Sequence, residues 1–278
     1  MMGSEQVNLS GAPETMLATL YLRALDNRSD KPILGDAQAE DAVRRIDYDY
    51  SKFRMRARQA PSVAIRAKAL DRWTEQCLAR QPDVTVLHLG CGLDTRVWRI
   101  DPPASVRWYD IDFPEVIDLR RKVFPERDGY ETVASSVTEP GLLDRIPDDR
   151  PVLVVAEGLT MYLSEEDGLG LLRGITGRFP SGELIFDAFN TFGVKLSNRF
   201  NPAVVAAKAH LEFAVDDPSD LESAVPGLRL VAEWQFTDAP ELDRYAWPTR
   251  MLLQAMGRIP VVRRMGRMLH YRFGDASR

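Results

Sequence analysis

Cysteine and histidine are scarce in this sequence. The two cysteines, Cys77 and Cys91, cannot build a disulfide framework or a zinc site, so no metal is expected. The three histidines, His88, His210 and His270, belong to no recognisable motif, and His88 falls inside a predicted strand, where a core position is expected. The chain therefore offers no convincing general base with a pKa near 7.

Long apolar runs and an excess of positive charge are also missing. No run approaches the roughly 20 apolar residues that span a bilayer, and the N-terminus lacks the basic-then-apolar pattern of a signal peptide. The net charge of −5 gives no reason to expect nucleic acid as a partner, and we interpret the arginines between Arg258 and Arg272 as a solvated face. These absences predict a reduced, cytoplasmic protein that contacts neither membrane nor nucleic acid.

What the sequence does contain is a strand followed by a glycine turn. Val84–Leu89 is an apolar run with β-branched residues, as expected for a buried strand. In Gly90-Cys91-Gly92 the missing side chains let the backbone turn sharply and approach a ligand closely. Asp94 and Thr95 suit the start of a helix, whose free N–H groups attract anions or hydroxyls. The dinucleotide-binding pattern has a third glycine where Thr95 stands, so the turn alone identifies no cofactor.

Acidic residues stand at the ends of two further predicted strands. Asp110 and Asp112 close the second strand, 18 and 20 residues beyond Gly92, where a dinucleotide fold places the acid that binds a ribose. Alternation with period two puts both carboxylates on one face, so both could point at the ligand crevice. Glu157 follows the most apolar run, 152–156, and either faces the ligand or has a structural role such as capping a helix.

Arg66 is an anomaly in a predicted helix. When the helix that starts near Pro61 is projected at about 100° per residue, Arg66 falls on the apolar stripe between Leu70 and Trp73. A guanidinium on a buried face is costly unless an anion meets it. Arg66 therefore snorkels to the edge of the stripe, pairs with a structural carboxylate, or clamps the carboxylate of a ligand.

Strands alternate with helices through most of the chain, which indicates an α/β fold with a mostly parallel sheet and a closing antiparallel pair. Helices are predicted at 14–27, at 36–46 and from 61 onward, before the first strand. We expect an N-terminal helical unit of residues 1–80 and a core of 81–278, with a lid-like insertion at about 190–215. The predicted strands cover 84–89, 106–112, 130–134, 152–156, 183–189, 228–236 and 270–273.

Several spaced motifs together resemble the leucine carboxyl methyltransferase family, and most closely its bacterial branch, which includes polyketide O-methyltransferases. The motifs are Leu89–Arg96, Tyr109–Val116 and Glu157–Leu163, with further similarity at Arg66–Asp71 and Tyr271–Gly274. The resemblance covers nearly the whole chain. It implies a class I methyltransferase fold, which is a Rossmann-like seven-stranded sheet of order 3-2-1-4-5-7-6 with strand 7 antiparallel and an N-terminal helical cap. It also implies S-adenosylmethionine as the methyl donor and an oxygen, often a carboxylate, as the acceptor.

The resemblance carries over to particular residues. Arg66 would hold the methionine carboxylate of the cofactor, and Glu157 would lie near its ammonium or sulfonium. Gly90 and Gly92 would let the backbone pass under the methionine part. Asp112 would bind the ribose hydroxyls, with Asp110 as a neighbouring or alternative acid.

One departure concerns the adenine end of the cofactor. After the third strand the family usually carries Asp-Leu, whose acid contacts the adenine amino group, whereas here the matching pair is Ser136-Val137. A hydroxyl can still accept that hydrogen bond, but without charge assistance, which is worth about 1 kcal/mol. Val137 preserves the apolar contact. We therefore expect cofactor binding to persist in a weaker form.

The acceptor is expected to be a carboxylate or a phenol of a small molecule, plausibly a polyketide. Because the chain lacks a convincing base, a carboxylate, which is already ionised at neutral pH, is favoured. Tyr162 and Arg199 are candidates for gripping it, although Tyr162 could simply pack and Arg199 could face solvent. Two alternatives are a nicotinamide-dependent oxidoreductase, which Thr95 and the absence of a hydride-site motif count against, and a non-catalytic relative that binds an adenosyl ligand, which Ser136 alone supports.

Overall fold

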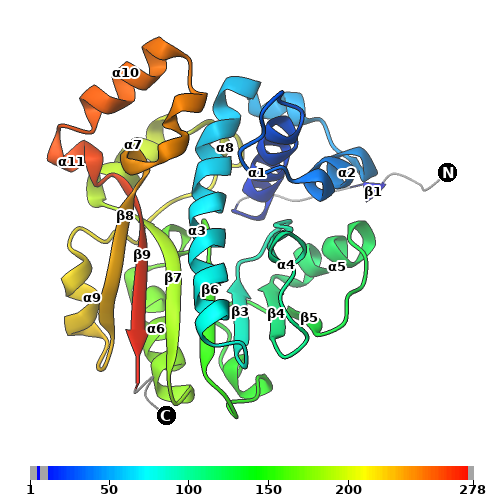
Figure 1. Ribbon diagram of the computed structural model, residues 1–278, viewed down its shortest axis with the longest axis vertical. Coiled ribbons are helices and arrows are strands. Elements are labelled where there is room, and N and C mark those ends of the chain that lie inside the picture. Colours follow the sequence, from blue (N-terminus) through cyan, green and yellow to red (C-terminus); the bar gives the residue numbers. More distant parts are fainter. Residues whose placement is uncertain (1–4, 7–11, 275–278) are drawn as a thin grey trace.

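The computed structural model describes residues 5–6 and 12–274, and among them seven strands form one sheet (Figure 1). Its order is β5-β4-β3-β6-β7-β9-β8, and β9 is antiparallel to both of its neighbours while the pairs from β5 to β7 are parallel. This confirms the predicted class I methyltransferase order. The strands are β3 (Thr85–Leu89), β4 (Arg107–Asp112), β5 (Tyr130–Ala134), β6 (Val152–Ala156), β7 (Gly182–Phe189), β8 (Arg229–Gln235) and β9 (Gly266–Phe273).

The last strand is longer than its sequence predicts. A strand was expected only from residue 270, but β9 begins at Gly266 and pairs with β7 over its full length. Arg267 made this part of the strand hard to predict, because a charged residue interrupts the apolar run. In the fold its guanidinium is buried and donates to the carbonyl oxygens of Val215 and Asp216 and to Glu233. A buried arginine breaks the apolar pattern from which strands are predicted.

Helices cover both faces of the sheet (Figure 1). On one face the long helix α3 (Ala60–Arg80) contacts β6, β7 and β9, and Leu70 packs with Val86 and Val155. On the opposite face lie α6 (Glu165–Arg178) and α9 (Pro218–Ala224), whose apolar side chains join the inner residues of β3, β6 and β7 in one core cluster. The short helix α4 (Arg96–Ile100) follows β3, and α5 (Pro114–Val123) follows β4.

The two helices at the N-terminal end pack over the loops that follow the strands. They are α1 (Ala12–Asn27) and α2 (Ala37–Arg45), the latter capped by Asp36, and a small parallel pair joins β1 (Glu5–Gln6) to β2 (Ile46–Asp47). Leu17 and Leu20 of α1 share a core cluster with Leu93 after β3 and with side chains of α5. The helices thus lie on the sheet's ligand side. The division at residue 80 into a cap and a core stays a prediction.

Residues 190–215 are more regular than expected. The first part of the predicted lid-like insertion is the helix α7 (Thr191–Phe200), where the side chain of Asn190 accepts the N–H of Gly193, and α8 (Pro202–Ala206) follows it. Between β8 and β9 lie α10 (Trp247–Met256) and α11 (Pro260–Arg263). Short 3-10 helices complete the chain: η1 (Tyr50–Phe53), η2 (Ala57–Gln59), η3 (Leu143–Arg145), η4 (Thr160–Tyr162), η5 (Phe236–Asp238) and η6 (Pro240–Arg244).

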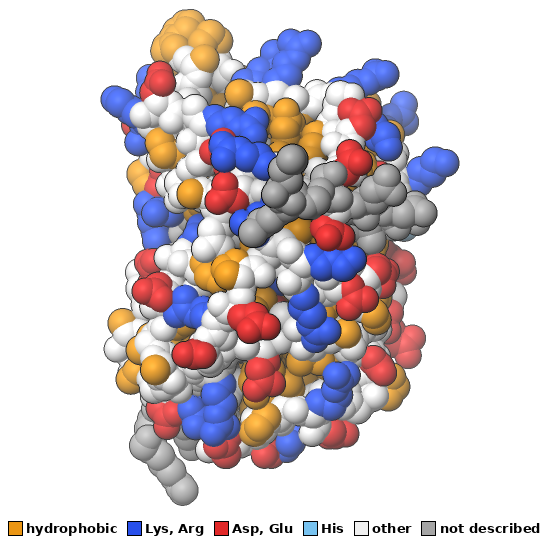
Figure 2. All heavy atoms as spheres, turned by 90° about the vertical axis from the view of Figure 1, so that its right-hand side faces the viewer, with side chains coloured by type: hydrophobic (Ala, Val, Ile, Leu, Met, Phe, Trp, Pro, Cys, Tyr) orange, Lys and Arg blue, Asp and Glu red, His pale blue; other side chains and the backbone are white. Residues whose placement is uncertain are grey.

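The surface shows no segregation of charge on the face drawn in Figure 2. Acidic and basic side chains intermingle there with apolar ones, which is the pattern of an ordinary solvated surface. Within the described part of the chain, no helix combines the length and the apolar character that crossing a membrane requires.

Candidate active site

A cavity of about 640 Å³ opens at the carboxyl ends of β3, β4, β6 and β7. Its walls come from the loops after these strands, from α1 and α3 on one side, and from the segments around α8, α10 and α11 on another. In parallel sheets ligands bind at this edge, because the loops that follow the strands meet there. Of the predicted cofactor residues, the structure brings seven to this cavity: Arg66, Gly90, Gly92, Asp112, Ser136, Val137 and Glu157.

The glycine turn after β3 forms the floor of the cavity. Gly90 and Gly92 have φ angles of 58° and 48°, in the left-handed region that other residues adopt at a cost. A Cβ atom on Gly92 would lie 3.0 Å from the Cβ atom of Met16, and one on Gly90 would lie 2.9 Å from Leu159 Cδ1. The backbone conformation therefore favours glycine at both positions, and a side chain at either one would crowd Met16 or Leu159.

Asp112 is fixed at the end of β4 beside that turn. The N–H of Gly92 donates to Asp112 Oδ2 at 2.7 Å, and the N–H of Phe113 donates to Oδ1 at 2.8 Å. Burial raises the pKa of the Asp112 carboxyl above its ordinary value, against the lowering effect of these two bonds. Each carboxylate oxygen retains acceptor capacity after one bond, so Asp112 can receive hydroxyl groups from the cavity.

The prediction that Asp110 also faces the crevice is wrong. Asp110 is fully buried and does not line the cavity. Its carboxylate accepts from Trp108 at 2.9 Å and from Tyr130 at 2.9 Å, and it contacts His88 and Arg120. The alternation of side chains along a strand does put Asp110 and Asp112 on one face of the sheet. Two residues of a strand span about 6.6 Å, however, so Asp110 lies that far below the edge of the sheet where ligands bind. Asp110 is a structural acid.

Glu157, at the end of β6, joins three arginines in the wall of the cavity. Its Oε1 accepts from Arg23 at 3.0 Å and from Arg66 at 3.1 Å, and its Oε2 accepts from Arg96 at 2.5 Å. Burial by itself would raise the pKa of Glu157, but the arginine charges outweigh it and hold the pKa at about 2. The side chain is therefore an anion at every physiological pH.

This shift predicts a dependence of stability on pH. Glu157 has an ordinary pKa of 4.5, which the fold lowers to about 2. Because the folded pKa is the lower one, the contribution is complete above pH 4.5 and is lost as the pH falls toward 2. One pKa unit corresponds to about 1.4 kcal/mol, so the free energy of unfolding should fall by about 3 kcal/mol across this window. Urea unfolding at pH 6, 4 and 3 measures it, and a constant free energy would contradict the assignment.

Arg66 lies on α3 and meets two carboxylates at the cavity wall. Besides Glu157, it donates through Nη1 to Asp187 Oδ2 at 3.1 Å, and Asp187 Oδ1 accepts the N–H of Gly158 at 2.6 Å. The side chain of Arg66 remains 21% exposed, so part of the guanidinium faces the cavity. The structural pairing and the access to a ligand, which the sequence left as alternatives, therefore coexist. Its role toward the cofactor stays a prediction.

A larger buried network around these residues was not predicted. Arg23 of α1 donates to Asp94 at 3.0 Å as well as to Glu157, and Arg96 donates to Asp71 at 2.7 Å. Arg99 extends it to Asp36 at 3.0 Å and to both oxygens of Asp71. Asp187, at the end of β7, was also missed, although an acid inside a predicted apolar strand is a recognisable signal. Arg23 could have been found in the same way, because it follows Leu20 and Met16 on the buried stripe of α1.

Ser136 and Val137 line the cavity beyond β5, at the position that the resemblance assigns to the adenine. The Ser136 hydroxyl is 2.9 Å from that of Thr138 and accepts the N–H of Thr138 at 3.3 Å. The hydroxyl is therefore partly engaged with its own loop, and no acid occupies the position.

Replacing Ser136 with aspartate should strengthen binding of S-adenosylmethionine. A carboxylate would add charge assistance worth about 1 kcal/mol, which is about a fivefold lower Kd. Isothermal titration calorimetry on Ser136→Asp and on the matched variant Ser136→Ala measures the effect, and the alanine variant should bind no better than the wild type. If the aspartate variant binds more weakly than the alanine variant, Ser136 does not lie at the adenine.

Of the two candidates for gripping an acceptor, Tyr162 lines the cavity and Arg199 does not. The Tyr162 hydroxyl lies 3.3 Å from Thr15 Oγ1 of α1, and burial raises the pKa of Tyr162, so the phenol is neutral and can donate. Arg199 is exposed and stacks on the ring of Phe200 at the end of α7. The structure therefore does not bring Arg199 to the cavity, and its side chain faces solvent, as the alternative interpretation had it.

The strand order and the ligand cavity at the carboxyl ends of the parallel strands define a class I S-adenosylmethionine-dependent methyltransferase. Comparison with known proteins supports this class and assigns the chain to one family within it. The chain belongs to the leucine carboxyl methyltransferase family, whose sequence profile matches residues 16–140, and the similarity to full-length relatives extends over almost the whole chain.

Two relatives and one solved structure illustrate the similarity. The chain is 44% identical to the tetracenomycin polyketide synthesis O-methyltransferase of Streptomyces glaucescens, over 97% of this chain and 99% of the relative. It is 36% identical to an S-adenosyl-L-methionine-dependent methyltransferase of Gibberella zeae, over 96% and 97%. A crystal structure of a DUF574 family protein from Streptomyces avermitilis shares the fold with a TM-score of 0.59 at 14% identity, covering 95% of this chain and 98% of the other.

Proposed function

We propose that this enzyme transfers the methyl group of S-adenosylmethionine to an oxygen, most favourably a carboxylate, of a small aromatic molecule of the polyketide type. The single observation that supports the acceptor class best is the 44% identity, over nearly the full chain, to an O-methyltransferase of polyketide synthesis. The site supports it through an apolar cavity that continues beyond the predicted cofactor residues. In this proposal one end of the cavity binds the cofactor and the other end binds the methyl acceptor.

The residues at the cofactor end fit S-adenosylmethionine. The left-handed backbone of Gly90 and Gly92 lines the cavity, and Asp112 stands beside it as an acceptor for ribose hydroxyls. Arg66 would bind the cofactor carboxylate with its cavity-facing edge, while Glu157 and Asp187 hold the guanidinium in place. When bound, the sulfonium supplies the activated methyl group, and the chain's own task is to orient the acceptor and exclude water.

The acceptor end is large and apolar. It is part of the cavity of about 640 Å³ that also contains the predicted cofactor residues, and small-molecule ligands bind chiefly to apolar walls. The apolar residues of the cavity lining are Met55, Met161, Leu163, Phe189, Leu211, Leu253, Met256 and Met265. Because methionine side chains adapt to irregular apolar surfaces, this lining suits a flat aromatic molecule better than a sugar or a peptide.

The groups near the acceptor end favour a carboxylate over a phenol. Tyr162 is a neutral donor at neutral pH, which suits an anionic oxygen, and it cannot serve as a base there. His88 lines the cavity, but both of its ring nitrogens are engaged, one by Asp110 and the other by Arg96. His210 is exposed, and His270 lies outside the cavity lining. A carboxylate needs no base, because its ordinary pKa is about 4.

Residues 190–215 form the lid over the acceptor end in this proposal. Asn201, Pro202 and Val204 of the α7–α8 region line the cavity, as does Leu211. They face α1, since α1 and α8 contact each other. The helical unit of residues 1–80 and this lid would thus close the cavity from two sides.

The test is a methylation assay with a panel of aromatic carboxylates and matched phenols. Radiolabelled S-adenosylmethionine detects transfer, and mild alkaline hydrolysis distinguishes a methyl ester, which releases methanol, from a stable ether. We expect esters from at least one fused-ring aromatic carboxylate. Binding of the cofactor without transfer to any acceptor would favour a non-catalytic relative, and a tight fluorescence response to NADH without cofactor binding would favour an oxidoreductase.

A further inference from the structure

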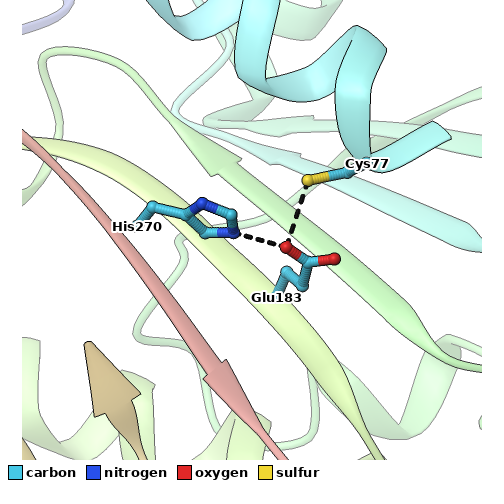
Figure 3. Close-up of side chains that lie close together, drawn as sticks. All are labelled: Cys77, Glu183 and His270. Atoms are coloured by element: carbon cyan, nitrogen blue, oxygen red, sulfur yellow. Dashed lines mark hydrogen bonds and ion pairs between the residues drawn. The ribbon is translucent and has the colours of Figure 1, made fainter. Parts of the chain in front are cut away.

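Three side chains that can bind a metal ion converge on the face of the sheet that α3 covers. Cys77 belongs to α3, Glu183 to β7 and His270 to β9, and they point toward one another (Figure 3). Their nearest sulfur, oxygen and nitrogen atoms all lie within 4.8 Å of one another. None of the three lines the cavity of the active site.

The three residues come from distant parts of the chain. Cys77 is 106 residues from Glu183, and Glu183 is 87 residues from His270. The Cys77 sulfur is 3.2 Å from Glu183 Oε2, which also contacts His270 Nε2. Burial differs among them, because Cys77 is 4% and His270 5% exposed whereas the Glu183 side chain is 26% exposed. The cluster is thus closed toward the core and reachable from solvent on the carboxylate side.

We propose that Cys77, Glu183 and His270 form a zinc-binding site, with a water molecule on the open side as the fourth ligand. Thiolate, imidazole and carboxylate are the ligands that Zn²⁺ takes from proteins, and it prefers four of them in a tetrahedral arrangement. Binding breaks the S–H bond of Cys77, forms an S–Zn bond and releases the proton to solvent. The proposal departs from the expectation, drawn from the two cysteines, that the chain holds no metal, because the fold brings a carboxylate and an imidazole to Cys77.

Arg80 is the side chain that competes with a cation at this site. Its Nη2 donates to both oxygens of Glu183, at 3.0 and 2.9 Å, and to the Cys77 sulfur at 3.3 Å. The Arg80 side chain is 55% exposed, so it can withdraw into solvent when an ion takes its place. Because the site joins the helical unit to the sheet, bound zinc would stabilise the fold rather than take part in methyl transfer.

The experiment uses the full untagged chain, freed of metal with a chelator and titrated with Co²⁺, which reports on the ligands by its spectrum. We expect one Co²⁺ per chain, a near-ultraviolet band from the thiolate and strong visible bands of tetrahedral geometry, all lost on adding Zn²⁺. Cys77→Ser and His270→Gln should abolish the thiolate band. The matched controls Cys91→Ala and His210→Gln should retain it.

A fifth variant keeps the test valid if these buried substitutions impair folding. Arg80→Gln removes the competing charge at an exposed position and should tighten Zn²⁺ binding by up to about fivefold, the upper end of the effect of one exposed charge pair. Wild-type protein should also melt about 5 °C higher in saturating Zn²⁺. Weaker binding by Arg80→Gln, a Co²⁺ spectrum without the thiolate band, or unchanged affinity in Cys77→Ser would each overturn the proposal.

Discussion

Replacing Arg66 with alanine is expected to weaken binding of S-adenosylmethionine by about 10- to 150-fold. A hydrogen-bonded charge pair between a guanidinium and a carboxylate contributes about 1.5–3 kcal/mol, and Arg66 is one of the arginines that line the cavity. The substitution also leaves Glu157 and Asp187 with one cation fewer, and both carboxylates would then repel the carboxylate of the cofactor. Isothermal titration calorimetry with S-adenosylmethionine and S-adenosylhomocysteine measures the loss.

The matched control for this prediction is Arg72→Ala. Arg72 lies on the same helix, is 43% exposed and pairs with Glu241 outside the cavity. It should bind the cofactor with the affinity of the wild type. Equal affinity in Arg66→Ala and Arg72→Ala would show that Arg66 has only a structural role, which is the alternative that its position on the buried stripe left open.

Replacing Glu157 with glutamine is expected to destabilise the protein by about 3–5 kcal/mol. Removal of one partner from a buried ion pair leaves the remaining charges uncompensated, and here Arg23, Arg66 and Arg96 would all lose their shared anion. The amide preserves the size of the side chain, so packing is not the cause. Urea unfolding followed by circular dichroism at pH 7 measures the effect.

The pH dependence separates charge from packing in that experiment. If the carboxylate charge is responsible, Glu157→Gln should also lose the fall in stability between pH 4.5 and 2 that is expected for the wild type. Glu166→Gln is the matched control, because Glu166 is an exposed acid in the first turn of α6 and its loss should cost less than about 0.5 kcal/mol. A loss of similar size in both variants would refute the network's role.

The centre of the sheet follows from local sequence because β3 and β6 are buried along their whole length. Both strands fall within one residue of the apolar runs that predict them, and the glycine turn after β3 has the left-handed backbone that its residues imply. Elements with mixed composition were less predictable. The first half of β9 contains a buried arginine, and α7 presents a polar stretch that Asn190 caps, so neither shows a simple period.

For the charged residues, too, one part of their placement could be predicted from the sequence and another part could not. Asp112 and Glu157 could be placed at the cavity because the end of a parallel strand has a fixed position in the fold. Whether a given acid then meets a ligand or an arginine depends on side chains that approach from other segments. Asp110 is two residues from Asp112, yet Arg120 of α5 and Tyr130 of β5 enclose it.

The sequence by itself determined the fold class and the edge of the sheet where the cofactor is expected, because these depend on periodicity, glycine and strand ends. The order of the strands followed from the resemblance of its motifs to a known family. Only the tertiary structure decided which charges neutralise one another. Arg23 and Glu157 are 134 residues apart, and Cys77 and Glu183 are 106 residues apart. No local pattern records such contacts, since they arise only when the helices of the N-terminal end pack against the sheet.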